Sequence, residues 1–226
     1  MLWFLLLFLA LLLYWEFVLA EGAHLGPRVV IWLYDLIAWR YDRIKKFDLA
    51  VEADLLGLPL TEALITIDAP VILDVAAGTG RVARALLRQP SFDGSIVHLE
   101  LSRRMLMEGK RACEIWPERT RWLCGPAHSL PFAAETFDAV ACVEALEFLP
   151  DARAALAECV RVLRPGGLLL VTNRVGWQAK LIFGKTFTRA AFQDLLHEFP
   201  FDVVRVHPWQ VEYDLGWGRK RMKDEG

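Results

Sequence analysis

The stretch VILDVAAGTGRVARAL, from Val71 to Leu86, decides the fold. An apolar run leads into Asp74, the turn contains Gly78-Thr79-Gly80, and the apolar spacing of a helix follows. A short apolar run, a glycine-rich turn and a helix in this order predict a buried strand whose carboxyl end presents backbone amides to a ligand. Several nucleotide-binding folds share this pattern, so the pattern alone leaves the ligand open.

Around this stretch the chain alternates short apolar runs with helical patterns. Strands are predicted at Val71–Val75, Ile96–Glu100, Arg121–Cys124, Phe137–Cys142, Leu168–Thr172, Val203–Val206 and Gln210–Leu215. The predicted helices between them include Arg81–Arg88, Arg103–Ala112 and Ala152–Leu163. This alternation predicts an α/β fold, with a doubly wound, mostly parallel sheet covered by helices on both faces. Only His207-Pro208 separates the last two runs, which predicts an antiparallel hairpin at the sheet edge.

The composition limits the possible partners. A length of 226 residues suffices for one α/β domain and a small addition. Lys and Arg total 26 against 28 Asp and Glu, so the chain has no global basic field and nucleic acid is not a predicted partner. The four cysteines form no C-x-x-C pair, and no metal site is predicted. The oligomeric state is left open.

The N-terminus, MLWFLLLFLALLLYWEFVLA, has its first charged side chain at Glu16. The run has about the 20 residues needed to cross a hydrocarbon core, and Trp3 and Tyr14-Trp15 suit the two membrane surfaces. Basic residues follow the run and none precedes it, which predicts a single-pass membrane protein with the bulk of the chain in the cytoplasm. The alternative is a signal peptide cleaved after Ala20.

The sequence pattern divides the chain into three parts. Residues 1–22 form the predicted transmembrane anchor, residues 23–66 form helices that serve as a lid or an interface, and residues 67–226 form the ligand-binding domain. In the second part, one helix is predicted from Arg28 to Lys46, and it is apolar on most sides. Such a helix is suited to lying at an interface or covering a pocket.

Two features of the sequence separate the possible ligands. Gly78, Gly80 and Ala83 match the pattern G-x-G-x-x-A, and Glu100 ends the second strand, where a carboxylate binds ribose hydroxyls. These features alone also describe a dinucleotide site. However, Asp74 precedes the first glycine, and a carboxylate there repels a pyrophosphate but attracts an ammonium or sulfonium group. A cationic ligand without phosphate is therefore favoured.

Four stretches carry a family resemblance, the first of them inside the stretch quoted above: ILDVAAGTGRVA, VHLELSRRML, LPFAAETFDAVACVEALEFLPD and LAECVRVLRPGGLLLVT. In order and spacing they resemble the motifs of class I S-adenosylmethionine-dependent methyltransferases, in particular the ubiquinone/menaquinone methyltransferase (type 11) group. The resemblance implies a Rossmann-like sheet of seven strands that ends in an antiparallel hairpin. It also implies S-adenosylmethionine as the cofactor. Since that compound is made in the cytoplasm, the catalytic domain is expected there.

The resemblance assigns cofactor-binding roles to residues of this chain. Asp74 binds the methionine end together with the backbone of the turn, which comprises Ala76, Ala77, Gly78, Thr79 and Gly80. Glu100 binds the ribose hydroxyls and Leu101 packs against the adenine. Upstream, YDLIAWRYD resembles the N-terminal signature of the family, which implies that Tyr41 lies over the cofactor.

One position departs from the family pattern. Pro126 stands where an Asp usually receives the adenine amino group, and a proline also has no N–H to offer. The resemblance then leaves the adenine to the backbone amide of Ala127 and to His128. The adenine contact is therefore expected to differ from that of the family.

The methyl acceptor is expected at the mouth that follows the fourth strand. Glu144 and Glu147 lie there, in VEALEFLPD, and either carboxylate is a candidate to accept a proton from a hydroxyl or to offset the charge of an amine. Glu144 is also assigned to cofactor binding. A methyl group on a sulfonium is already electrophilic, so alignment and exclusion of water are the main requirements for direct in-line displacement.

A membrane anchor favours an acceptor dissolved in the same membrane. We expect methyl transfer to a small lipophilic molecule, such as a quinone, a phospholipid or another lipid. One alternative is a methyltransferase of a soluble metabolite, anchored for localisation only. Another is a catalytically silent methyltransferase fold that serves as a membrane assembly factor, an alternative that Pro126 supports.

Overall fold

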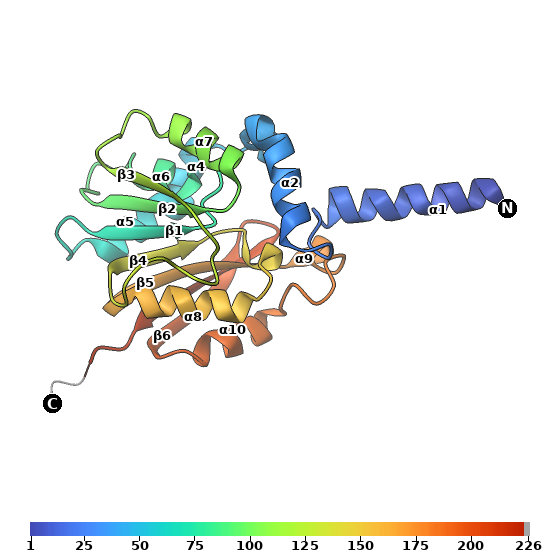
Figure 1. Ribbon diagram of the computed structural model, residues 1–226. Helices are drawn as coiled ribbons and strands as arrows, with labels where there is room; N and C mark the ends of the chain where they lie inside the picture. The colour runs from blue at the N-terminus through green and yellow to red at the C-terminus, as the bar shows by residue number, and fades with distance from the viewer. Residues whose placement is uncertain (224–226) are drawn as a thin grey trace.

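A single sheet forms the centre of the molecule in the computed structural model, which describes residues 1–223 (Figure 1). Its strands are β1 (Val71–Val75), β2 (Ser95–Glu100), β3 (Thr120–Cys124), β4 (Phe137–Cys142), β5 (Leu163–Arg174), β6 (Phe201–Trp209) and β7 (Tyr213–Lys220). Their order is β3-β2-β1-β4-β5-β7-β6. Strands β1 to β5 pair in parallel, and β7 runs antiparallel to β5 and β6. The predicted doubly wound, seven-stranded, mostly parallel sheet is confirmed.

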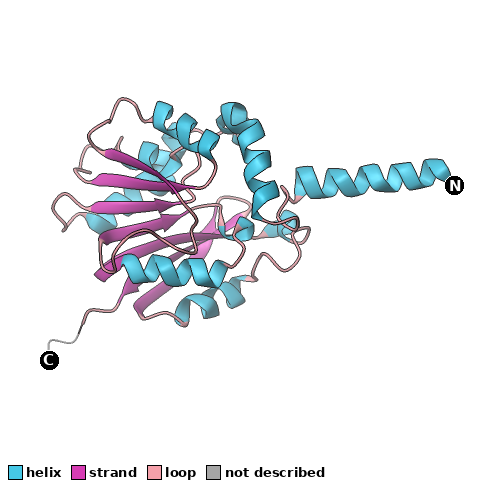
Figure 2. Ribbon diagram, viewed as in Figure 1, coloured by secondary structure: helices cyan, strands magenta, loops and turns pink. Residues whose placement is uncertain are grey.

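Helices cover both faces of this sheet (Figure 2). The α-helices of the described chain are α1 (Leu2–Tyr14), α2 (Pro27–Ile37), α3 (Tyr41–Lys45), α4 (Leu49–Glu52), α5 (Leu58–Leu64), α6 (Arg81–Leu86), α7 (Arg103–Ala112), α8 (Ala152–Val162), α9 (Gly176–Ala179) and α10 (Arg189–His197), of which α1 lies away from the sheet. Shorter helical turns are η1 (Trp15–Leu19), η2 (Ala38–Arg40), η3 (Ala53–Gly57) and η4 (Leu146–Phe148). Successive residues of β1 face opposite cores: Leu73 belongs to the core that includes α8 and α10, and Ile72 to the core that includes α5 and α6.

The glycine turn after β1 requires its glycine at position 80. Gly80 is the N-cap of α6 and has a φ of 77°, in the left-handed region. A Cβ on Gly80 would lie 2.9 Å from the ring of Trp122 and 3.1 Å from the sulfur of Cys113. Backbone conformation and packing therefore both select glycine, and the turn can bring its amides to the carboxyl end of β1.

The antiparallel hairpin at the sheet edge is confirmed, but its turn lies later than predicted. His207 and Pro208 continue β6, and residues 210–212 make the turn, with Gln210 at a φ of 55°. Proline is tolerated in β6 because this is the edge strand, where a missing N–H need not interrupt the interior of the sheet. Strand β5 also starts earlier than predicted, since Leu163 already pairs with Phe137.

The single helix predicted from Arg28 to Lys46 is wrong in one respect, because the chain bends twice. Helix α2 ends at Ile37, η2 follows, and α3 then ends at Lys45. The bend has a physical reason: it turns Tyr41 into the protein and brings Asp42 to the glycine turn, where Asp42 accepts a hydrogen bond of 2.5 Å from the Thr79 hydroxyl. The lid is thereby tied to the turn that it covers.

The N-terminal helix projects from the rest of the molecule (Figure 1). Helix α1 has no buried residue, and with η1 it forms an 18-residue apolar segment, Leu2–Leu19, with a mean hydropathy of 2.3. By length and composition it is the one helix among residues 1–223 that is able to cross a membrane.

The residues that follow α1, from Trp15 to Ala23, form the base of the N-terminal helix and pack on the domain. The boundary predicted at residue 22 therefore lies within a packed region. The Trp15 indole donates a hydrogen bond of 3.0 Å to the Leu181 carbonyl. Ala20 and Ala23 are buried against Ile182. Helix α1 is therefore free of the domain, whereas η1 belongs to the apolar segment and also contacts the domain through Trp15.

At this base, the Glu21 carboxylate contacts three polar side chains. Its carboxylate accepts hydrogen bonds from the Tyr34 hydroxyl at 2.8 Å and from Arg174 Nη2 at 3.3 Å, and it lies 3.5 Å from Lys45 Nζ. Arg174, at the end of β5, also pairs with Glu147 at 2.9 Å. One carboxylate thus links the base of the N-terminal helix to the lid and to the sheet.

Replacing Glu21 by glutamine should lower the free energy of unfolding in a pH-dependent way. Burial by itself raises the pKa of Glu21, but the charges of Lys45 and Arg174 and the Tyr34 hydroxyl bring the pKa below its ordinary value of 4.5. The carboxylate therefore stabilises the fold above that value, and the contribution is lost as the pH falls through the lowered pKa. At pH 7 we expect Glu21→Gln to cost about 1–3 kcal/mol.

Urea unfolding of the detergent-solubilised protein across a pH series measures this effect. The difference between Glu21→Gln and the unmodified protein should shrink below pH 4.5. Glu108→Gln is the control, because Glu108 forms an exposed pair with Arg111 that contributes about 0–1 kcal/mol. Equal stability of the Glu21 variant and the unmodified protein at pH 7 would contradict the linking role.

Candidate functional site

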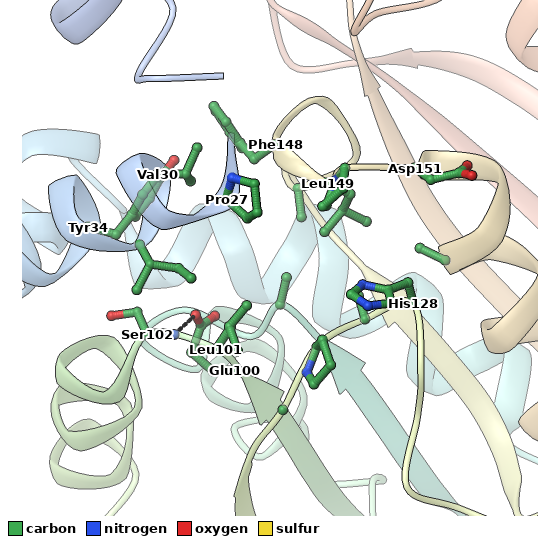
Figure 3. A pocket seen from close by; sticks show the side chains of 18 of the residues that line it. Pro27, Val30, Tyr34, Glu100, Leu101, Ser102, His128, Phe148, Leu149 and Asp151 are labelled. Atoms are coloured by element: carbon green, nitrogen blue, oxygen red, sulfur yellow. Dashed lines mark hydrogen bonds between the residues drawn. The ribbon is translucent and has the colours of Figure 1, made fainter. Parts of the chain in front are cut away.

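Two cavities meet at the carboxyl ends of β1, β2 and β4. The first has a volume of about 230 Å³, and Figure 3 shows part of its lining. It is lined by Pro27, Arg28, Val30, Ile31, Tyr34, Ala76, Glu100, Leu101, Ser102, Gly125, Pro126, Ala127, His128, Glu144, Ala145, Phe148, Leu149, Pro150, Asp151 and Ala155. The second has about 40 Å³ and is lined by Tyr41, Phe47, Asp74, Ala76, Ala77, Gly78, Thr79, Arg81, Val82, Val143 and Glu144. Ala76 and Glu144 line both, so the two cavities are parts of one site.

This site contains nearly all of the residues predicted from the sequence. Glu100, Leu101, Ala127 and His128 line the first cavity, and Tyr41, Asp74 and the turn line the second. Gly80 lines neither cavity in the described part of the chain and has the conformational role given above. Glu147 is also absent from both linings.

Glu100 fastens the glycine turn to the end of β2. Its Oε2 accepts a hydrogen bond of 2.9 Å from the Gly78 N–H, and its Oε1 accepts one of 2.8 Å from the Ser102 N–H (Figure 3). Burial raises the pKa of Glu100, and these backbone donors partly oppose that rise. Each carboxylate oxygen has a second lone pair. Glu100 can therefore still accept hydrogen bonds from two neighbouring hydroxyls of a ligand.

Asp74 is held by a histidine that sequence reasoning did not single out as functional. Asp74 is buried at the centre of the sheet, and its Oδ2 lies 3.1 Å from His98 Nδ1. The His98 ring stacks on Trp122, with 3.8 Å between centroids. Burial raises the pKa of Asp74, while the contact with His98 lowers it. His98 thus orients the carboxylate that faces the second cavity.

Glu144 forms part of a chain of charges at the wall that the cavities share. Arg81 donates to Glu144 and also makes two hydrogen bonds to Glu52, of 2.6 and 2.7 Å. The Glu144 backbone, at a φ of 52°, donates a hydrogen bond of 2.6 Å to Thr172 Oγ1. The pairing with Arg81 thus holds the Glu144 carboxylate at the wall that both cavities share. The geometry therefore suits Glu144 to attracting a ligand cation.

Glu147 does not lie at the mouth where it was expected. It is buried, 2.9 Å from Arg174 Nε, and its Oε1 accepts a hydrogen bond of 3.1 Å from the Tyr213 hydroxyl. The difference arises because the residues after β4 form the tight turn η4, which directs Glu147 away from Glu144. Its part in proton transfer stays a prediction, and its observed contacts are with Arg174 and Tyr213.

Aromatic rings of the lid, residues 23–66, border both cavities. The Tyr34 ring lies 5.7 Å from the rings of Tyr41 and Phe148, and Tyr41 lies 5.8 Å from Phe47. Asp35 accepts a hydrogen bond of 2.5 Å from the Ser102 hydroxyl, beside Glu100. Tyr34 lines the first cavity and Tyr41 lines the second, so both rings of this segment border the site.

The side of the first cavity nearest β3 is largely apolar. Leu101, Pro126 and Ala127 line it, and the exposed His128 side chain lies beside them (Figure 3). Pro126 offers no N–H. A flat, uncharged ring can pack here, and His128 is the polar side chain available to its edge.

Sequence comparisons connect this geometry to known proteins. The methyltransferase domain family matches residues 73–171. Demethylmenaquinone methyltransferase of Thermotoga maritima is 30% identical over 165 residues, which cover 69% of this chain and 66% of that protein. Ubiquinone/menaquinone biosynthesis C-methyltransferase UbiE of Roseobacter denitrificans is 37% identical over 102 residues, 44% of this chain and 40% of that protein. The matches thus span between 40% and 66% of the length of these relatives.

Solved structures share the fold at low sequence identity. A putative S-adenosyl-L-methionine-dependent methyltransferase from Methanococcus maripaludis has a TM-score of 0.66 and 19% identity, covering 85% of this chain and 95% of that one. The [4+2]-cyclase SpnF has a TM-score of 0.72 and 18% identity, covering 88% and 97%. Because one of these neighbours is named a cyclase, the fold alone does not specify the reaction.

The site and the sequence matches agree in one assignment. The glycine turn, the acidic end of β2 and the carboxylates around the second cavity suit a ligand with ribose hydroxyls and a positive charge. The chain belongs to the class I S-adenosylmethionine-dependent methyltransferases, with S-adenosylmethionine as its cofactor, and it resembles the ubiquinone/menaquinone C-methyltransferases in sequence.

Proposed function

We propose that this protein is a membrane-anchored enzyme that transfers the methyl group of S-adenosylmethionine to a small lipophilic acceptor, a quinone in the first instance. The observation that carries the proposal is the apolar end of the first cavity, which lies under α2 close to the base of the apolar N-terminal helix. The names of the relatives, which refer to quinone methylation, favour a quinone over a phospholipid.

Individual residues of the site suit individual parts of the cofactor. Glu100 binds the ribose hydroxyls through its free lone pairs, and Leu101 and Ala127 contact the adenine. Asp74 and Glu144 provide negative charge for the ammonium and sulfonium groups. When bound, S-adenosylmethionine supplies an electrophilic methyl group. The remaining lone pairs of Glu100 and the position of the Asp74 carboxylate at the second cavity support this fit.

The acceptor binds at the end of the first cavity formed by the lid and η4. Val30, Ile31, Phe148 and Leu149 make this end apolar, which suits a hydrocarbon-substituted ring and excludes water. The protein contributes alignment and desolvation more than acid–base catalysis, because Glu144 is already paired with Arg81.

The N-terminal segment is proposed to be a retained membrane anchor rather than a cleaved signal peptide. Ala20, the last residue before the alternative cleavage point, is fully buried, and Trp15 is bonded to the domain. These contacts support a segment that stays joined to the domain as part of the fold. The basic residues that follow the segment favour a cytoplasmic catalytic domain.

The two alternatives differ from the proposal in measurable ways. A methyltransferase of a soluble metabolite needs the helix only for localisation, so its turnover does not depend on the membrane. A silent assembly factor, which Pro126 supports, need not bind the cofactor productively.

Removal of the Glu100 carboxylate should weaken cofactor binding. In Glu100→Ala the ribose loses charged hydrogen bonds and the turn loses its tie to β2, so we expect a loss of about 1–3 kcal/mol. Titration calorimetry with S-adenosylmethionine measures this change, and NADH should not compete. Glu108→Gln, on the exposed face of α7, should bind normally. Unchanged affinity in Glu100→Ala, or competition by micromolar NADH, would overturn the assignment of the turn.

Deletion of Met1–Tyr14 should separate the function of the anchor from that of the domain. Since α1 has no buried residue, the shortened chain should fold and keep its cofactor affinity. Turnover on a long-chain demethylquinol in vesicles should fall much more than turnover on a soluble, short-chain analogue. Equal losses on both substrates would indicate that α1 supports the fold, and no loss on either would contradict an acceptor in the membrane phase.

A further inference from the structure

Helix α2 has two apolar faces, and only one of them covers the site. Val30, Ile31 and Tyr34 line the first cavity. On the opposite side Trp32, Leu36 and Trp39 are exposed by 56%, 54% and 61%. Their spacing of four and three residues puts them in one row along the helical path, here named the outer row. When large apolar side chains are exposed together on the surface of a protein, they usually mark a binding surface.

The outer row continues toward the base of the N-terminal helix. Phe183, after α9, is 64% exposed, and its ring lies 5.8 Å from the ring of Trp15 and 6.1 Å from that of His24. Leu25, just before α2, is also exposed. The apolar surface of α1 is therefore continued by apolar side chains on the domain.

The direction of α2 suits contact with a bilayer that α1 crosses. In Figures 1 and 2, α2 runs across the direction of α1 on the side of the domain from which α1 leaves. The hydrogen bonds from Tyr34 and Arg174 to Glu21 and from Trp15 to Leu181 fix this arrangement. With the segment Leu2–Leu19 across the bilayer, α2 lies along the membrane surface.

Basic side chains accompany the outer row. Arg28, Arg40, Arg43 and Lys46 are exposed on α2 and directly after it. The Arg40 guanidinium lies 4.0 Å from the centroid of the Trp39 ring. Tryptophan and leucine beside lysine and arginine are typical of helices in the boundary between lipid headgroups and acyl chains, and the positive charge favours anionic headgroups.

We propose that the outer row of α2 is a second membrane contact, embedded in the headgroup–acyl boundary of an anionic bilayer at the surface where α1 ends. This inference rests on the proposed membrane anchor. Helix α2 then has lipid on one side and the first cavity on the other, so a single helix separates the site from the acyl chains. A movement of this helix is enough to admit an acceptor from the bilayer without passage through water.

Depth measurements by electron paramagnetic resonance test this proposal on the full chain. The protein, with exposed Cys124 replaced by serine, is placed in nanodiscs of phosphatidylcholine and phosphatidylglycerol. A nitroxide is attached to a cysteine introduced by Leu36→Cys, with Trp39→Cys as a second position should the first variant fail to fold. Ile115→Cys, which is exposed after α7, is the aqueous control, and Leu9→Cys reports on α1 itself. Power saturation compares accessibility to oxygen with accessibility to a water-soluble nickel complex.

We expect the labels at positions 36 and 39 to be at least threefold more accessible to oxygen, relative to nickel, than the label at position 115. An aqueous signal at 36 and 39, with position 9 buried in lipid, would overturn the second contact and leave the anchor intact. Aqueous signals at all of these positions would overturn both the contact and the membrane part of the proposed function.

Discussion

A buried guanidinium, that of Arg174, determines how the N-terminal segment meets the sheet. Arg174 is only 3% exposed, and a buried charge is costly unless oppositely charged groups surround it. Glu147 pairs with it from η4, and Glu21 pairs with it from the base of the N-terminal helix. Because Glu21 also accepts a hydrogen bond from Tyr34, this charge fixes the positions of the base, the lid and the end of β5 together.

Contacts within the protein hold the candidate site in shape. Glu100 is bonded to the glycine turn, Asp74 to His98, and Asp42 to Thr79. Groups held in this way lose little conformational freedom when a ligand binds. The polar half of the site therefore suits a cofactor of fixed shape, and the apolar half, beneath α2, suits acceptors that vary in their hydrocarbon part.

The parts of the structure that depend on residues close together in the sequence could be predicted from the sequence. The apolar run before Asp74, the glycines and the regular alternation of elements were enough for the sheet and for most of the residues of the site. The ion pairs of Arg81 with Glu52 and of Arg174 with Glu21 join segments far apart in the sequence, and no spacing rule indicates them. Pro208 was read as a break because a proline interrupts inner strands, whereas the edge position of β6 permits it.

The most direct measurement of the central claim follows the methyl group itself. The detergent-solubilised full chain is incubated with S-adenosylmethionine labelled in the methyl group and with a total lipid extract that contains quinols, and the phases are then separated. The account predicts label in a quinone of the organic phase, and no such label with Glu100→Ala. Label that stays on the donor, or that appears only in a water-soluble product, would contradict it.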